Sequence, residues 1–303
     1  MKRISLALFV ILLALCPMLF ARAEGTFDRT LSVSGPVTMD LTTGSGSVTV
    51  RTGSSNQVVI HGIVRASNDW FGGDADSAVR TVESNPPIEQ NGNNIRIGYN
   101  LSDDIKRHVS ITYEVSVPAD TALQAHSGSG NIGVEGLRKS VNVNTGSGDV
   151  SLRDIGPQSN AHTGSGSIRG QDVSLPFKAH TGSGGVDATL TGNGDADVET
   201  GSGSVRLRGI KGGLHARTGS GDLSIDGNVQ GPWNLHTGSG SVRMALGSSA
   251  GFNLSAHTGS GSIHSDLPIT VQGTLNRHEL KGAVRGGGPD VDVSTGSGDI
   301  ELR

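Results

Sequence analysis

The chain has 303 residues, of which 47 are glycine, 3% are aromatic and one is cysteine, and its formal net charge is −4. This mixed, slightly acidic charge argues against nucleic acid as a partner, which would require a clustered basic face. One cysteine cannot build a disulfide framework, and so few aromatic residues do not make an ordinary globular core. Glycine at this level indicates low complexity unless a repeat orders it.

The first 23 residues predict a secretory signal peptide. Lys2 and Arg3 precede an apolar run over residues 6–20, and Ala21-Arg22-Ala23 supplies the small residues of a cleavage site. The run is short for a spanning helix and no second one follows, so we expect no transmembrane segment in the mature chain. The segment therefore predicts export to the periplasm or to the extracellular surface.

Residues 24–125 predict N-terminal strands that cap the rest of the chain. Apolar alternation indicates strands over 41–64, 95–97 and 109–117. Residues 66–94, rich in Asp, Asn and Gly, are expected to be an insertion, and no helix is expected beyond the signal peptide. The insertion contains a possible ligand loop whose carboxylates and indole ring suit a sugar, namely Asp69, Trp70, Asp74 and Asp76.

Residues 126–303 form a sequence repeat. The tetrapeptide (Thr/Ser)-Gly-Ser-Gly begins at Thr43, Ser127, Thr145, Thr163, Thr181, Thr200, Thr218, Thr237, Thr258 and Thr295. From Ser127 onward the first six steps are 18 or 19 residues, followed by steps of 21 and 37. We expect the last step to hold two rungs, one of which lacks the motif. A fixed period of this size indicates stacked units that bury their faces on one another.

Each unit is predicted to be a pair of strands joined by a glycine turn. Apolar residues alternate on both sides of the motif, as in Val141 and Val143 before it and Val150 and Leu152 after it. The motif Thr shares the inward parity, which predicts an internal ladder that bonds hydroxyls or backbone. The fold class is therefore all-β, a single-stranded β-helix or β-solenoid of about ten rungs and roughly 50 Å in length.

Three runs resemble a known family: Tyr113-Glu-Val-Ser-Val-Pro-Ala-Asp120, Ser127-Gly-Ser-Gly-Asn-Ile132 and Val141-Asn-Val-Asn-Thr-Gly-Ser-Gly-Asp-Val150. They are similar to the DUF4097 family of adhesin-like proteins, and the similarity covers most of the mature chain. The resemblance implies a bacterial cell-envelope β-solenoid with pectate-lyase-like, right-handed winding. It brings no catalytic residues and no cofactor.

Histidines precede several copies of the motif. His126, His162, His180, His236 and His257 have outward parity, and we expect His162 with His180, and His236 with His257, to lie on neighbouring rungs about 5 Å apart. Stacked imidazoles suit a transition metal or a pH sensor. A solvated polar face is the simpler interpretation, because Asn144, Glu199 and Arg217 interrupt the column.

Calcium is the second candidate metal that the sequence pattern suggests. Asp149, Asp222 and Asp299 directly follow the motif, as acidic residues do in calcium-binding repeats. A repeated calcium site needs a repeated carboxylate, and the other copies carry Ser, Asn or Gly instead. The sequence therefore favours no bound metal or cofactor.

The repeated polar columns favour a non-catalytic cell-envelope rod that binds a glycan or an envelope partner, or acts as a scaffold. The alternative is a carbohydrate-active β-helix enzyme, such as a polysaccharide lyase or hydrolase, with its site in residues 66–110. A third hypothesis is a self-associating structural element, because solenoid ends can stack. No paired acid and base signature accompanies the repeat, so we expect no catalysis.

Overall fold

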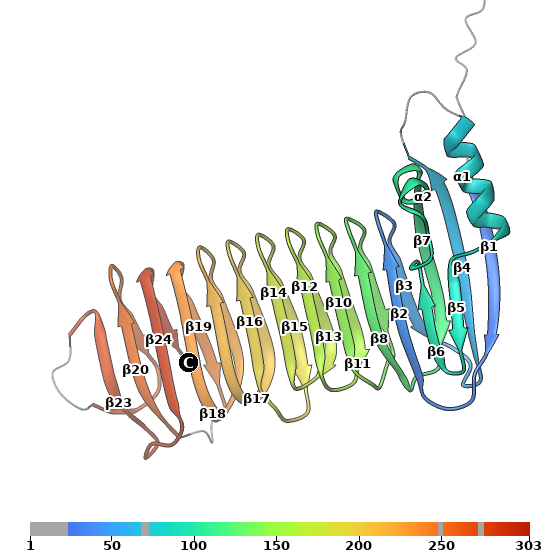
Figure 1. Ribbon diagram of the computed structural model, residues 1–303. Helices are drawn as coiled ribbons and strands as arrows, with labels where there is room; N and C mark the ends of the chain where they lie inside the picture. Colours follow the sequence, from blue (N-terminus) through green and yellow to red (C-terminus); the bar gives the residue numbers. More distant parts are fainter. Residues whose placement is uncertain (1–23, 68–72, 248–250, 272–275) are drawn as a thin grey trace, which may run out of the picture.

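The computed structural model describes residues 24–67, 73–247, 251–271 and 276–303. The predicted signal peptide, 1–23, lies outside these residues. The described chain is a long rod of stacked strands, with a block of strands and helices at its N-terminal end (Figure 1). The all-β solenoid prediction is confirmed.

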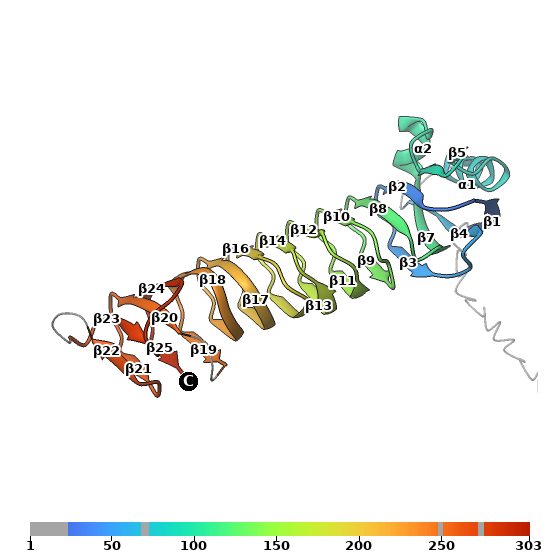
Figure 2. The same ribbon diagram turned by 90° about the horizontal axis from the view of Figure 1, so that it is seen from below.

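Every motif copy joins two strands, one on each of two long sheets. The strands before the motif pair in parallel. They are β2 (Val37–Thr43), β8 (Thr121–Ser127), β10 (Val141–Thr145), β12 (Ser159–Thr163), β14 (Phe177–Thr181), β16 (Ala196–Thr200), the later parts of β17 (Val205–Thr218) and β18 (Leu223–Ser239), β24 (Asp290–Ser297) and β20 (Phe252–Thr258). Figure 2 shows this sheet along one side of the rod.

The strands after the motif form the second sheet, which is also parallel along the rod. They are β3 (Val48–Thr52), β9 (Ile132–Glu135), β11 (Val150–Ile155), β13 (Ile168–Ser174), β15 (Val186–Thr191), the first parts of β17 and β18, β19 (Val242–Leu246), β25 (Ile300–Leu302) and β21 (Ile263–Ser265). The core lies between the two sheets, because alternate side chains of each strand point to opposite faces. Val141, Val143, Val150 and Leu152 are all buried.

The motif threonines tie each rung to the one before it. Thr145 Oγ1 donates to the carbonyl of Gly130 on the preceding rung at 2.8 Å and accepts the N–H of Gly148 at 3.2 Å. Thr163, Thr181 and Thr200 repeat both bonds. The inward ladder is confirmed, and its partners are backbone groups.

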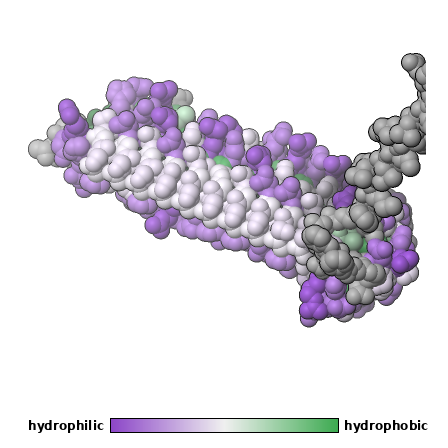
Figure 3. All heavy atoms as spheres, turned by 90° about the horizontal axis from the view of Figure 1, so that it is seen from above, coloured by the Kyte–Doolittle hydropathy of each residue, from purple (hydrophilic) through white to green (hydrophobic). Residues whose placement is uncertain are grey.

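The glycines of the motif are required by close approach of neighbouring turns. A Cβ on Gly148 would overlap the carbonyl oxygen of Gly130, and a Cβ on Gly146 would overlap that of Gly128. Any larger residue at either position would push the turns apart and break the threonine bonds. The turns align along one edge of the rod, where Figure 3 shows a pale stripe of intermediate hydropathy between hydrophilic flanks.

The N-terminal end is closed by antiparallel strands and a helix. On one sheet, β7 (Val109–Val117) lies between β3 and β4 (Gln57–Ala66), and β1 (Glu24–Ser32) pairs with β4. On the other sheet, β6 (Asn94–Ile97) pairs with β2, and β5 (Ile88–Asn91) pairs with β6. These strands all belong to residues 24–125, the segment for which we predict a cap.

The expectation of no helix is wrong. Residues Gly73–Ser84 of the insertion form α1, and Asp103–His108 form α2. Ala78, Val79 and Val82 of α1 are buried, and the helix contacts β1 and β4. A short apolar stripe within an Asp- and Gly-rich stretch thus suffices for a helix once a sheet lies beneath it.

The expected rung order at the C-terminal end is also wrong. β24 and β25 do not continue the stack but lie between β18/β19 and β20/β21. No rung without a motif separates Thr258 from Thr295 in the described residues. Instead β23 (Glu279–Val284) pairs antiparallel with β20, and β22 (Ile269–Val271) pairs antiparallel with β23 (Figure 1). The 37-residue step therefore contains a hairpin that covers the end of the sheet.

We predict that Thr181→Val destabilises the rod by about 2 kcal/mol, because it leaves the buried carbonyl of Gly166 and the part-buried N–H of Gly184 without their partner. Valine has nearly the shape of threonine, so packing is retained. Urea unfolding of the variant measures the loss. Thr189→Val, the same change at a half-exposed outward position of β15, is the matched control and should change stability by less than about 0.5 kcal/mol. Equal effects of the two changes would contradict the role of the ladder.

Candidate functional site

The outward side chains of the two sheets form two polar faces. We call those of the strands before the motif the histidine face, and those of the strands after the motif the arginine face. Because the rungs are in register, equivalent outward positions line up as columns along the rod. The position directly before the motif gives, in spatial order, Thr42, His126, Asn144, His162, His180, Glu199, Arg217, His236, Ser294 and His257.

One of the two predicted histidine pairs is confirmed. The rings of His162 and His180 stack with centroids 5.1 Å apart and planes 9° apart. The lone pairs of ring nitrogens lie in the ring planes, so parallel rings do not direct them at a common point. Because zinc–nitrogen bonds are about 2.1 Å long, one ion cannot bind both rings unless at least one turns.

The other predicted pair is wrong. Ser294 of the inserted strand β24 lies between His236 and His257. His236 Nδ1 is 2.9 Å from the hydroxyl oxygen of Ser294. His236 and His257 precede consecutive copies of the motif, but the rung of β24 is inserted between them and separates them.

A mixed cluster of ligand-type side chains lies in the middle of the histidine face. Asp197, Glu199 and His215 each place one potential ligand atom, a carboxylate oxygen or a ring nitrogen, within 4.8 Å of the other two. His215 Nε2 is 3.4 Å from Glu199 Oε1, and His180 Nδ1 is 3.5 Å from Glu199 Oε2. The cluster was missed because it runs diagonally between two columns.

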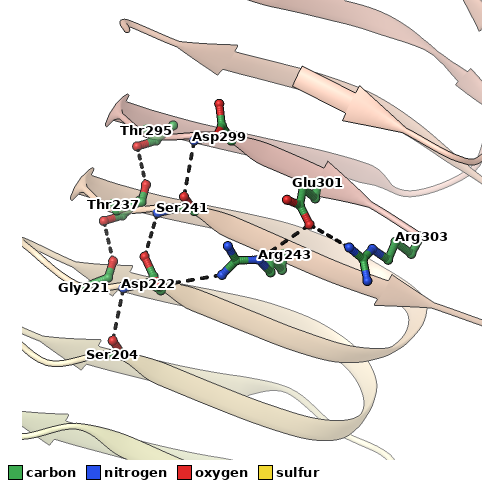
Figure 4. Close-up of polar contacts among 11 residues, drawn as sticks. Ser204, Gly221, Asp222, Thr237, Ser241, Arg243, Thr295, Asp299, Glu301 and Arg303 are labelled. Atoms are coloured by element: carbon green, nitrogen blue, oxygen red, sulfur yellow. Dashed lines mark hydrogen bonds and ion pairs between the residues drawn. The ribbon is translucent and has the colours of Figure 1, made fainter. Parts of the chain in front are cut away.

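The arginine face carries alternating charges on neighbouring rungs. Arg206 Nη1 is 3.6 Å and Arg208 Nη1 is 2.9 Å from the carboxylate of Asp187. Arg243 lies 3.7 Å from Asp222 and 3.5 Å from Glu301. Figure 4 shows its guanidinium group between the two carboxylates. Most of these side chains are about half exposed and that of Glu301 is 27% exposed, so their ion pairs contribute little to stability and remain available to a ligand.

An open groove runs along this face. One part has a volume of about 480 Å³, and a second part of about 320 Å³ shares Arg206, Ser224 and Arg243 with it. Ser224 lies between Arg206 and Arg243 in the same column. A short side chain between two long ones leaves the hollow, which we call the arginine groove. The second part ends at Glu301 and Arg303.

The aspartates that follow the motif bond to the backbone of the next rung. Asp149 Oδ1 accepts the N–H of Ser167, and Asp222 Oδ1 accepts that of Ser241, both at 2.8 Å. Asn131 makes the same contact with the N–H of Asp149. The column therefore has a structural use that Ser, Asn and Asp share, which explains why the carboxylate is not repeated in every copy.

The carboxyl group of Asp149 also titrates abnormally. The backbone bond from Ser167 and the ion pair with Arg169 hold the pKa of Asp149 below its usual value. The same backbone contact with Ser262, and its hydroxyl, lower the pKa of Asp299. Hydrogen bonds that favour the charged form are the cause in both cases.

The predicted ligand loop is only partly visible. Asp69 and Trp70 lie outside the described residues, as does the side chain of Asp74. Asp76 is an exposed residue of α1. The structure thus replaces part of the expected loop by a helix, and a ligand at these four residues stays a prediction.

The fold and the faces define the class of protein: a parallel β-solenoid of two sheets, with antiparallel strands at both ends and ordered polar columns outside. The chain belongs to the Toastrack DUF4097 family, whose model matches residues 37–303. No curated protein matches the chain. In the part of the chain that the structure describes, no helix is long and apolar enough to span a membrane.

Two solved structures are similar to the chain. A candidate cell adhesion protein from Clostridium sporogenes is 14% identical, with a TM-score of 0.32 and coverage of 91% of this chain and 98% of that chain. A candidate adhesin from Bacteroides fragilis is 11% identical, with a TM-score of 0.34 and coverage of 92% and 97%. Likeness at this level assigns neither a site nor a function.

We predict that the contribution of Asp149 to stability is lost in acid. The folded pKa of Asp149 lies below the ordinary aspartate value of 3.8, so the carboxylate stabilises the fold above pH 3.8 and ceases to do so as pH falls through the folded pKa. The stability difference between wild type and Asp149→Asn should therefore shrink between about pH 6 and pH 2. Urea unfolding across this range is the measurement.

Arg169→Gln is the companion variant, because it removes the ion pair and leaves the bond from Ser167. It should retain most of the pH dependence of wild type, since that backbone bond is the larger cause of the shift. If the difference in unfolding free energy between wild type and Asp149→Asn did not change with pH, the lowered pKa of Asp149 would be contradicted.

Proposed function

We propose that this protein is an exported, non-catalytic rod of the bacterial cell envelope that binds an extended polar polymer, a glycan chain, along the arginine groove. The observation that carries the proposal is the open groove over several rungs, lined by guanidinium and carboxylate groups. Export is supported by the signal-peptide pattern of residues 1–23.

The chemistry of the groove suits sugar hydroxyls. Arginine presents several donors in a planar fork, and the carboxylates of Asp187 and Glu301 accept. Donors and acceptors thus alternate along the rod, as a chain of hydroxyl groups requires. An open groove with one repeat per rung, about 4.8 Å, favours a polymer laid lengthwise over a compact small molecule.

The non-catalytic part of the proposal rests on the disposition of the acidic groups. Asp103 and Asp104 of the region 66–110 are exposed on α2, where they pair with Lys106 and Arg107. Polysaccharide hydrolysis needs one protonated and one ionised carboxyl group on either side of a bond. Asp103 and Asp104 instead form ion pairs within their own helix, as carboxylates on a solvated helix surface do.

We predict that Arg206→Gln and Arg243→Gln each weaken glycan binding about tenfold, because each removes a charge-assisted hydrogen bond worth about 1.5 kcal/mol or more. A glycan array identifies the ligand, and calorimetry with the best one gives the affinities. Arg51→Gln is the matched control: Arg51 is an exposed, ion-paired arginine of the same face, outside the groove. Retained affinity in both groove variants, or an array without binding, would refute the proposal.

We predict that the protein is found outside the cytoplasm. Protease treatment of intact cells and osmotic-shock fractionation locate it. Digestion on intact cells would place the rod at the surface, and release by shock with protection from protease would place it in the periplasm. Deletion of residues 2–22 should retain it in the cytoplasm. Wild-type protein that remains in the cytoplasm would contradict export.

A further inference from the structure

The cluster on the histidine face has the composition of a metal site. Asp197 and Glu199 are two positions apart on β16 and point outward, and His215 lies opposite Asp197 on the neighbouring strand β17. Their potential ligand atoms are within 4.8 Å of one another. The three groups therefore reach one point from two adjacent rungs.

The orientation of Glu199 is the second feature. Arg217 lies directly opposite Glu199 on β17, yet the carboxylate contacts His180 and His215, one from each neighbouring rung. The carboxylate of Glu199 is thus turned toward His215 and Asp197. Two carboxylates brought together in this way repel each other, and a cation between them relieves the repulsion.

We propose that Asp197, Glu199 and His215 bind one divalent transition-metal ion of the zinc type. Two carboxylate oxygens and one imidazole nitrogen are ligands that zinc accepts, at about 2.1 Å each. In a tetrahedral site the ligand atoms are about 3.4 Å apart. His215 and Glu199 already have this separation, and the widest separation in the cluster, at most 4.8 Å, has to contract by up to about 1.4 Å. Side-chain rotation can provide this, because the side chains of Glu199 and His215 are 43% and 38% exposed.

His180 is a positioning residue in this proposal. Its ring contacts the second oxygen of Glu199, and the stack with His162 holds it there. Such contacts to the outer oxygen of a ligand orient the carboxylate toward the metal. The remaining coordination position is left to water, so the site is open on the solvent side.

The ligand set also selects among metals. Calcium and magnesium prefer all-oxygen sites with more ligands, and an imidazole favours zinc, nickel or copper. Lys178, which pairs in register with Asp197, and Arg217 add positive charge on either side. They lower the affinity for any cation, so a site of moderate strength is expected. A bound ion would cross-link the two neighbouring rungs that contain β16 and β17 on this face.

The test is titration calorimetry with zinc chloride on the purified protein, made from the full-length sequence and freed of metal with a chelator. We expect one saturable site in wild type and at least tenfold weaker binding in Glu199→Gln and in His215→Asn. His126→Asn is the matched control. His126 is an exposed histidine in the column that contains Glu199, and its neighbours in that column are Thr42 and Asn144. It should bind as wild type does.

Circular dichroism and the melting temperature in chelator show whether each variant is folded. Zinc should raise the melting temperature of wild type and of His126→Asn, and leave that of Glu199→Gln unchanged. Absence of saturable binding would show an ion-pair cluster and overturn the proposal. Binding that His162→Asn abolishes and His215→Asn leaves intact would overturn it as well, by placing the metal at the stacked pair.

Discussion

The structure depends on the contact between the motif turns of neighbouring rungs. A threonine hydroxyl turned inward donates to the glycine carbonyl of the rung before it, as Thr163 does to Gly148. The same turns approach so closely that only glycine fits at two of their four positions. Hydrogen bond and close approach act together: a rung that slipped by one residue would turn its threonine outward and its valines into water. The motif therefore fixes the register of both sheets.

A fixed register leaves the outward positions free to carry function. Because folding is specified by the inward residues and the turns, a change such as serine to arginine outside has little effect on the core. Arg206, Ser224 and Arg243 occupy one such column, and the groove results from their order. The mixed cluster with Glu199 arises in the same way on the other face. The two candidate surfaces thus share one scaffold and differ only in the outward residues.

The sequence predicted the middle of the rod well and its ends poorly, for one physical reason. Within the array, the segments that connect consecutive motif copies are too short to reach any rung but the next one. The copies therefore stack in chain order, and His162 and His180 were predicted correctly to be neighbours. At the end, a 37-residue connection allows the last copy to pair with any free edge, and all motif edges are chemically alike. Nothing in the residues between Thr258 and Thr295 shows that β24 enters the stack before β20. The cluster at Glu199 includes a diagonal contact between residues that do not pair in register. Such a contact can be predicted only when the strand register is already known.

The insertion of β24 and β25 changes which strands are left at the C-terminal end. A parallel stack exposes one unpaired edge per sheet, and long exposed edges invite pairing with other chains. On the histidine face, β23 covers the edge of β20 with an antiparallel strand. On the arginine face the last strand of the described residues is β21, which is three residues long and whose central His264 pairs with Asp266 just after the strand. One edge is thus covered and the other is short and polar, and both features disfavour end-to-end pairing of rods through their strand edges.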